Sequence, residues 1–188
     1  MKKMVRNKLA VAGALCAGIF GAGNASAVYL DVVPQSIVPP SNPVGIGSIV
    51  QVDVNIGDLT DFSAPALGAY ELNILFNSTV LQYSGAVWGS ELDQSLLGSF
   101  QQQESSGAGN GRVNFLEISY DDIATLNDLQ SGEFTLFTAY FTAIAAGKSD
   151  IVVEPLSLSD AQGNALTVNQ NYDSSVSVVP VPAALPLL

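Results

Sequence analysis

Apolar and polar residues alternate at every second position through most of this chain, and no other feature constrains its fold as strongly. In the segment from Ser48 to Ile56, the apolar residues Val50, Val52, Val54 and Ile56 share one side. The other side carries Gln51, Asp53 and Asn55. A half-buried strand has this period, because its successive side chains point to opposite faces of the sheet.

The same period predicts about nine strands, over residues 29–33, 48–56, 70–76, 81–87, 112–120, 134–144, 151–153, 165–168 and 175–179. They are short, and Gly, Asn and Asp residues separate them. Long stretches of helical period are almost absent from the sequence. The pattern therefore predicts an all-β fold, an antiparallel β-sandwich or jelly roll, as a single domain over residues 28–178.

Three local features need separate interpretation. The alternation shifts phase by one residue near Phe115 and Leu116, which predicts a β-bulge. The segment 134–144 is apolar on both faces, as in a central strand that is covered on both sides, and it is equally compatible with an interaction face. Leu92, Leu96 and Phe100 are spaced by four residues, which predicts a short helical insert over residues 91–104, with an ordered loop that caps one side of the sandwich as the alternative.

The N-terminus has the pattern of a secretory signal peptide. Four basic residues precede the apolar run from Leu9 to Phe20, and Ala25-Ser26-Ala27 provides the small residues that a signal peptidase requires. The run is shorter than the roughly 20 residues of a membrane-spanning helix. We therefore expect residues 1–27 to be removed, and Cys16 with them. The mature domain then contains no disulfide.

Composition excludes several kinds of chemistry. The chain contains no histidine, and removal of the leader leaves Arg112 and Lys148 as its only basic residues, against 17 acidic ones. Serine-histidine triads, thiol catalysis and His- or Cys-ligated metal sites are therefore excluded, and nucleic acid is a poor partner for so acidic a protein. A carboxylate pair for glycoside hydrolysis is the remaining enzymatic option, with candidates at Glu71, Glu117, Asp121 and Asp122.

Calcium is the one cofactor that the sequence suggests. Asp160 and Asn164 are its candidate ligands, because their segment resembles the start of a calcium-binding loop and calcium prefers oxygen ligands. The segment lacks the Asp or Asn of the third position of such a loop, and Asn171 stands where the final Glu is expected. A plain turn is the favoured interpretation.

Aromatic residues offer a second kind of site. Trp88 and Tyr140 are the candidates for stacking on sugar rings, and Trp88 is out of phase with the apolar residues Leu81, Tyr83 and Val87 before it. Packing in the core is the competing interpretation for both residues.

The C-terminal residues Val179, Pro180, Val181 and Pro182, followed by Ala183-Ala184-Leu185-Pro186-Leu187-Leu188, resemble the start of a PEP-CTERM sorting signal. Val181 stands where that family usually has Glu. In the family, a transmembrane helix and an arginine cluster follow, and an exosortase processes the signal in Gram-negative bacteria. Neither feature follows Leu188 in this sequence. The resemblance implies that residues 179–188 direct the protein to the cell surface or the extracellular matrix.

The body of the chain resembles the cohesin-like domains of PEP-CTERM proteins. The segments that carry the resemblance are residues 44–50, 67–77 with Val80-Leu81, 132–141 and 158–160 with Gly163-Asn164. It implies a jelly-roll sandwich used for adhesion or assembly. We therefore expect an exported protein without enzymatic activity, in the periplasm, on the outer surface or in the matrix, that binds protein or polysaccharide through a sandwich face. A carbohydrate-binding module is the alternative, and a carboxylate-dependent glycoside hydrolase is a third.

Overall fold

The computed structural model describes residues 27–36 and 43–181. The predicted leader, except Ala27, and the sorting tail from Pro182 onward lie outside the described residues. The described chain forms eleven strands and two short helices. Their bounds are β1 (Ala27–Ser36), β2 (Val44–Gly45), β3 (Ile49–Gly57), β4 (Leu67–Leu75), β5 (Leu81–Trp88), β6 (Ser99–Glu104), η1 (Ala108–Asn110), β7 (Arg112–Ser119), α1 (Ile123–Leu129), β8 (Phe134–Ala143), β9 (Gly147–Asp160), β10 (Thr167–Tyr172) and β11 (Ser174–Val179).

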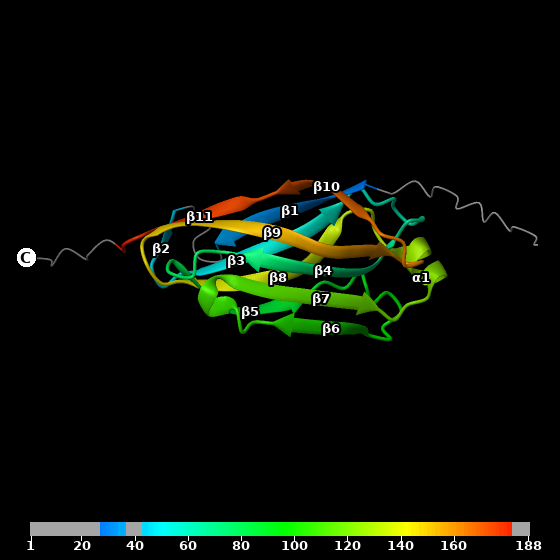
Figure 1. The fold of residues 1–188 in the computed structure, drawn as a ribbon, viewed down its shortest axis with the longest axis horizontal. Coiled ribbons are helices and arrows are strands. Elements are labelled where there is room, and N and C mark those ends of the chain that lie inside the picture. Colours follow the sequence, from blue (N-terminus) through cyan, green and yellow to red (C-terminus); the bar gives the residue numbers. More distant parts are fainter. Residues whose placement is uncertain (1–26, 37–42, 182–188) are drawn as a thin grey trace, which may run out of the picture.

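The strands form two layers. The five-stranded sheet has the order β10-β1-β3-β8-β5, and the six-stranded sheet has the order β2-β11-β9-β4-β7-β6. Figure 1 looks onto the six-stranded sheet, with α1 at one end of the sandwich. Neighbouring strands are antiparallel except for the two edge pairs β1–β10 and β2–β11, which are parallel. The structure confirms the predicted β-sandwich, with two strands more than the nine expected.

The core lies between the two sheets and is formed by the residues that the alternation predicts. Val50, Val52, Val54 and Ile56 of β3 are all buried. Aromatic rings fill the centre, where Phe115 of β7 stacks on Phe137 of β8 with ring centroids 4.0 Å apart. No helix among the described residues is long and apolar enough to cross a membrane.

The predicted helical insert over residues 91–104 is wrong. Residues 99–104 form strand β6, which pairs with β7 at the edge of the six-stranded sheet, and turns occupy the segment before it. Of the three residues that suggested a helix, only Leu92 is buried. The helix lies at α1 instead, where Asp122 caps the N-terminus by accepting a hydrogen bond from the Thr125 N–H. Pairing with an available strand edge has therefore overridden a weak helical period.

The predicted bulge at Phe115 and Leu116 is also wrong. Strand β7 pairs with both β4 and β6 without a shift of register. The phase does not change, because Glu117 continues the inward series of Val113 and Phe115 as a buried acid.

The expectation that β8 is covered on both sides is wrong over residues 138–142. Phe137, Ala139, Phe141 and Ala143 point into the core, but Thr138, Tyr140 and Thr142 are only half-buried on the outer face. That outer face is therefore accessible to a ligand, which is the other interpretation that the sequence allowed.

Candidate functional site

The outer face of the six-stranded sheet is divided into a polar half and an apolar half. Hydrogen-bonded side chains cross β9, β4 and β7 in the polar half: the Asn73 amide donates to Glu154 at 2.7 Å, and the Asn114 amide donates to Asn73 at 3.1 Å and to Glu71 at 3.2 Å. These side chains form a hydrogen-bonded polar network across the three strands. The half nearer to α1 is apolar.

Large apolar side chains are exposed at the α1 end of β6 and β7 and in the loop before β6, and we call them the apolar patch: Leu96, Leu97, Phe100, Ile118 and Tyr120. Phe100 of β6 and Ile118 of β7 are direct cross-strand partners on the same face. Tyr120 follows Ile118, and the loop before β6 contributes the two leucines. Large apolar side chains that are exposed at one end of a sheet mark a candidate interaction site.

The loop that carries the leucines is held in place at several points. Leu92 is buried, and its carbonyl accepts a hydrogen bond from the Ser119 hydroxyl at 2.7 Å. The Asp121 carboxylate accepts from the N–H of Gln94 at 2.6 Å and also from the Ser95 hydroxyl. Asp93 accepts from the Gly98 N–H at 2.8 Å. The fold therefore fixes this loop on both sides of Leu96 and Leu97.

Between these anchors the leucines point into solvent. Leu96 is 87 % exposed and Leu97 is 71 % exposed. Leu96 also has a φ of 60°, a left-handed conformation that is unfavourable for a side chain of this kind. The loop thus holds two large apolar groups outside the core, at some cost in stability.

A buried acid lies beneath the patch. The Glu117 carboxylate accepts hydrogen bonds from the Tyr70 hydroxyl at 2.9 Å, the Ser99 hydroxyl at 2.6 Å and the Gln101 amide at 2.9 Å. These bonds join β4, β6 and β7. Burial, followed by the negative charge of Glu117 and its hydrogen bond, raises the pKa of Tyr70 far above its ordinary value. This network fixes the strands from which Phe100 and Ile118 project.

The carboxylates considered for hydrolysis have structural partners instead. Glu117 points into the core, whereas Glu71 is on the outer face of the same sheet, so these two acids do not face one cleft. Asp121 holds the loop before β6. Asp122 caps α1, and the hydrogen bond from the Thr125 backbone holds the pKa of its carboxyl below the ordinary value.

Asp160 and Asn164, the candidate calcium ligands, form the turn after β9. The Asp160 carboxylate accepts from the N–H of Gln162 at 2.9 Å, from the N–H of Asn164 at 2.8 Å and from the Asn164 side chain at 2.9 Å. Donors thus surround both carboxylate oxygens, as the plain-turn interpretation requires. Within residues 27–36 and 43–181, no group of three or more acidic side chains is placed to hold a metal ion. Calcium binding stays a prediction without support from this geometry.

The two aromatic candidates occupy different environments. Trp88 packs against Phe115 and Phe137, with ring centroids 5.6 and 6.2 Å away, so its position matches the core-packing interpretation. Tyr140 is half-buried on the outer face of the five-stranded sheet, opposite Gly85 of β5. The space above Gly85 is open, because a Cβ atom built there would meet nothing within 4 Å. Tyr140 is therefore the aromatic residue that remains available to a ligand.

Comparison with known proteins identifies the fold. No protein-family model matches the chain, and no curated protein matches its sequence. Among solved structures, the sixth cohesin of scaffoldin B from Acetivibrio cellulolyticus aligns with a TM-score of 0.59 at 14 % identity, over 81 % of this chain and 99 % of that one. The fold is that of a cohesin module.

Two further solved structures have a similar fold. The OlpA cohesin from Clostridium thermocellum, solved as a type I cohesin–dockerin complex, aligns with a TM-score of 0.58 at 12 % identity, over 80 % of this chain and 99 % of that chain. A non-cellulosomal cohesin from the archaeon Archaeoglobus fulgidus gives 0.56 at 19 % identity, over 80 % and 91 % of the two chains. The cohesin-like fold suggested by the sequence is thereby confirmed.

The apolar patch on this cohesin-like fold is not predicted by the sequence pattern. The spacing of Leu96 and Phe100 predicted instead the apolar side of a helix, and that helix does not form. The signal was present in the sequence, where the pair Leu96-Leu97 stands between serine and glycine within a polar segment. Such a pair fits a loop better than the core-facing stripe of a helix.

Proposed function

We propose that this chain is an exported, non-enzymatic module for adhesion or assembly, and that it binds a protein partner through the apolar patch. The observation that carries the proposal is the fixed loop that holds Leu96 and Leu97 in solvent just before β6, the strand whose exposed Phe100 pairs with Ile118. A rigid surface binds with little loss of conformational entropy. The fold supports a protein partner, since the similar OlpA cohesin was solved in complex with a dockerin.

Two observations support the absence of a reaction. The chain contains no histidine, and the carboxylates that could replace it are used in caps, turns and strand contacts. Glycoside hydrolysis requires two acids that face one cleft. The candidates Glu71, Glu117, Asp121 and Asp122 form no such pair.

A photo-crosslinker compares the two faces of the sandwich directly. We suggest replacing Tyr120 of the apolar patch, or Tyr140 on the opposite sheet, with p-benzoylphenylalanine in the native bacterium. Both substitutions keep an aromatic ring. Protein adducts formed from position 120 and not from position 140 support the proposal. Equal adducts from both positions, or adducts only from position 140, contradict it.

Export and sorting form the second part of the proposal. We propose that signal peptidase cleaves after Ala27 and that an exosortase-type enzyme processes the tail, which delivers the domain to the periplasm, the outer surface or the extracellular matrix of a Gram-negative bacterium. Ala27 is the first residue of β1, so cleavage there leaves the sandwich almost whole. Beyond β11 the chain leaves the sheet, with Pro180 and Val181 exposed to a processing enzyme.

Deletion of residues 179–188 from the native gene tests the sorting step. The shortened protein should be released from the surface fraction into the medium. Unchanged fractionation would rule out a sorting role for this segment. Deletion of residues 2–24 is the matched control for the leader, and it should leave the protein in the cytoplasm.

Polysaccharide binding is the second candidate function, and Tyr140 is the observation that favours it. Tyr140 is the cross-strand partner of Gly85, where an added Cβ atom would meet nothing within 4 Å. Polar side chains continue across the same face, where Asp53 accepts hydrogen bonds from Gln35, Gln51 and Thr138. A glycan array with the Tyr140→Ala variant tests this function. Glycan binding that is lost in a folded Tyr140→Ala variant supports polysaccharide binding. Trp88→Ala is the control, because it removes an aromatic ring that packs in the core.

A further inference from the structure

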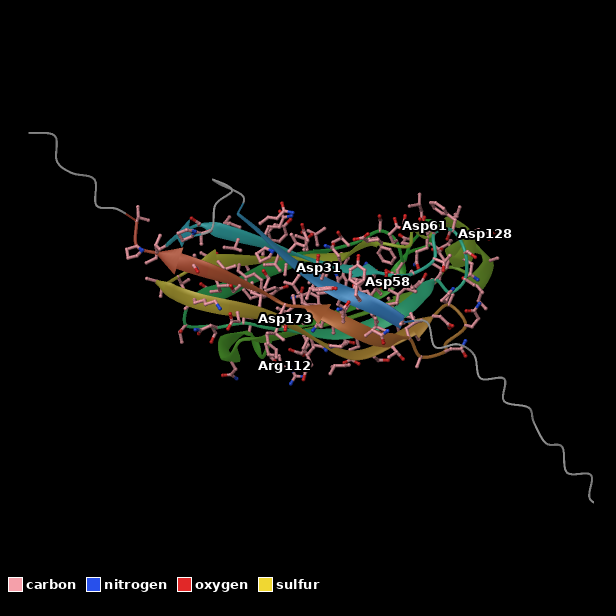
Figure 2. All side chains as sticks on the ribbon, turned by 90° about the horizontal axis from the view of Figure 1, so that it is seen from above. Asp31, Asp58, Asp61, Arg112, Asp128 and Asp173 are labelled. Atoms are coloured by element: carbon pink, nitrogen blue, oxygen red, sulfur yellow. The ribbon has the colours of Figure 1, made fainter. Side chains whose placement is uncertain are left out.

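The α1 end of this sandwich carries acidic side chains and, among the described residues, no basic one. Several acidic residues lie in the loops at the α1 end or on α1 itself: Asp58, Asp61, Glu91, Asp93, Asp121, Asp122, Asp128 and Glu133. In the part of the chain that the structure describes, the basic residues are Arg112 and Lys148, and Lys148 pairs with Asp150 at 2.6 Å. Figure 2 shows Asp61 and Asp128 at the α1 end and Arg112 well away from it.

The apolar patch lies within this acidic end. Asp93 and Asp121 hold the loop of Leu96 and Leu97. Asp122 follows Asp121 in the chain, two residues after Tyr120, and is exposed. Two cationic residues at the far end cannot neutralise these acids, because screening at physiological salt limits such interactions to about 8 Å. The patch is therefore an apolar surface with an acidic rim.

We propose that the partner of the apolar patch is a protein surface that presents apolar side chains flanked by lysine or arginine. This inference rests on the proposed function and specifies the chemistry of its partner. Apolar groups at the centre supply most of the affinity of such an interface. Opposite charges at the rim accelerate association and exclude partners of like charge.

The same charges argue against other occupants. A second copy of this chain would bring its own acidic end against the first. An anionic glycan or lipid headgroup would be repelled in the same way. A neutral lipid surface would accept the two leucines but gain nothing from the carboxylates around them.

Calorimetry with designed peptides tests the proposal. The probe is an amphipathic Leu/Lys helix of about 18 residues, or five helical turns, and a Leu/Glu peptide of equal length is its counterpart. We expect only the Leu/Lys peptide to bind. Replacement of Leu96 and Leu97 together by serine should weaken binding by about tenfold, as loss of a central apolar contact does. That double variant keeps every charge, so general attraction between opposite charges cannot explain the loss.

A second pair of variants tests the rim. Asp122→Asn removes a charge but keeps a side chain that caps a helix equally well. It should weaken binding by about two- to threefold at low salt, the size typical of one exposed charge pair. Asp31→Asn on the other sheet is the matched control and should leave binding unchanged.

Several results would overturn the inference. They are equal binding of the Leu/Lys peptide to the double serine variant, equal binding of the Leu/Glu peptide, or affinity that does not respond to salt. Leucine-dependent sedimentation with phosphatidylcholine vesicles, without peptide binding, would show a membrane partner instead. The crosslink from position 120 separates this failure from failure of the proposed function, because it reports the native partner whatever its charge.

Discussion

Tyr70 and Tyr83 both lie against the core, but only one of them has a partner for its hydroxyl group. The Tyr70 hydroxyl donates to Glu117 at 2.9 Å, whereas among the described residues the buried Tyr83 hydroxyl has no hydrogen-bond partner. Removing one partner of a buried hydrogen bond costs about 1–3 kcal/mol. We therefore expect Tyr70→Phe to lower the free energy of unfolding by this amount. Tyr83→Phe should leave it unchanged or raise it. Urea denaturation measures both, and equal losses would contradict the assignment.

The same two residues predict how stability changes at alkaline pH. Burial raises the pKa of Tyr83 to about 12, and it raises the pKa of Tyr70 further together with the charge of Glu117. A tyrosine in the unfolded chain releases its proton near pH 10. Stability is therefore fully present below about pH 10 and is lost as the pH rises toward 12, because only the unfolded chain ionises. The urea midpoint should fall over this range. The Tyr83→Phe variant should show a smaller fall, and an unchanged midpoint in the native protein would contradict the prediction.

Leu96 illustrates a conflict between stability and binding. Its left-handed backbone is adopted more readily by asparagine, which is among the residues most often found there. We expect Leu96→Asn to raise the free energy of unfolding by about 0.5–1 kcal/mol and to weaken binding at the patch. Leu97→Asn is the control, since it removes the same apolar group and relieves no positive φ. If Leu96→Asn destabilises the fold as much as Leu97→Asn does, the loop conformation is not strained.

At the scale of the elements, the junction between η1 and β7 depends on one glycine. Gly111 has a φ of 77°, and its carbonyl accepts a hydrogen bond from the Phe76 N–H at 2.8 Å. A Cβ atom on Gly111 would lie 2.0 Å from the Phe76 carbonyl oxygen, whereas one on Gly109 would meet nothing within 4 Å. We expect Gly111→Ala to lower the free energy of unfolding by at least about 2 kcal/mol and Gly109→Ala to have little effect. Thermal unfolding of the two variants checks this, and similar midpoints would contradict it.

The strands show what a period of two can and cannot predict. It identified β3 and β4, because a strand with one buried face has apolar residues at every second position. It failed at β6, where nearly every side chain is exposed and no face is selected. It failed again at Glu117, because a polar residue can occupy a core position once Tyr70, Ser99 and Gln101 supply donors. Those donors come from other strands and are invisible in a local pattern.

At the scale of the whole molecule, the sequence predicted the sandwich and its acidic character but not the place of the candidate site. The acids at the α1 end are spread over residues 58–133 and share one end only because β3, β5 and β7 all finish there. The leucines of the patch reach the same end through the loop before β6. Such proximity follows from strand topology, which no local period encodes.

This concentration of like charge predicts that salt stabilises the protein. Raising NaCl from about 0.01 M to 0.1 M shortens the screening length from about 30 Å to about 10 Å. Repulsion within the acidic end then weakens in the folded state more than in the expanded unfolded chain, so the thermal midpoint should rise. An Asp58→Asn and Asp128→Asn double variant should show a smaller rise, whereas a midpoint that is constant or falls would contradict the prediction.

Calcium and magnesium chloride at equal ionic strength should have equal effects on the thermal midpoint, because N–H donors already surround the Asp160 carboxylate. A larger effect of calcium would support a bound ion at that turn.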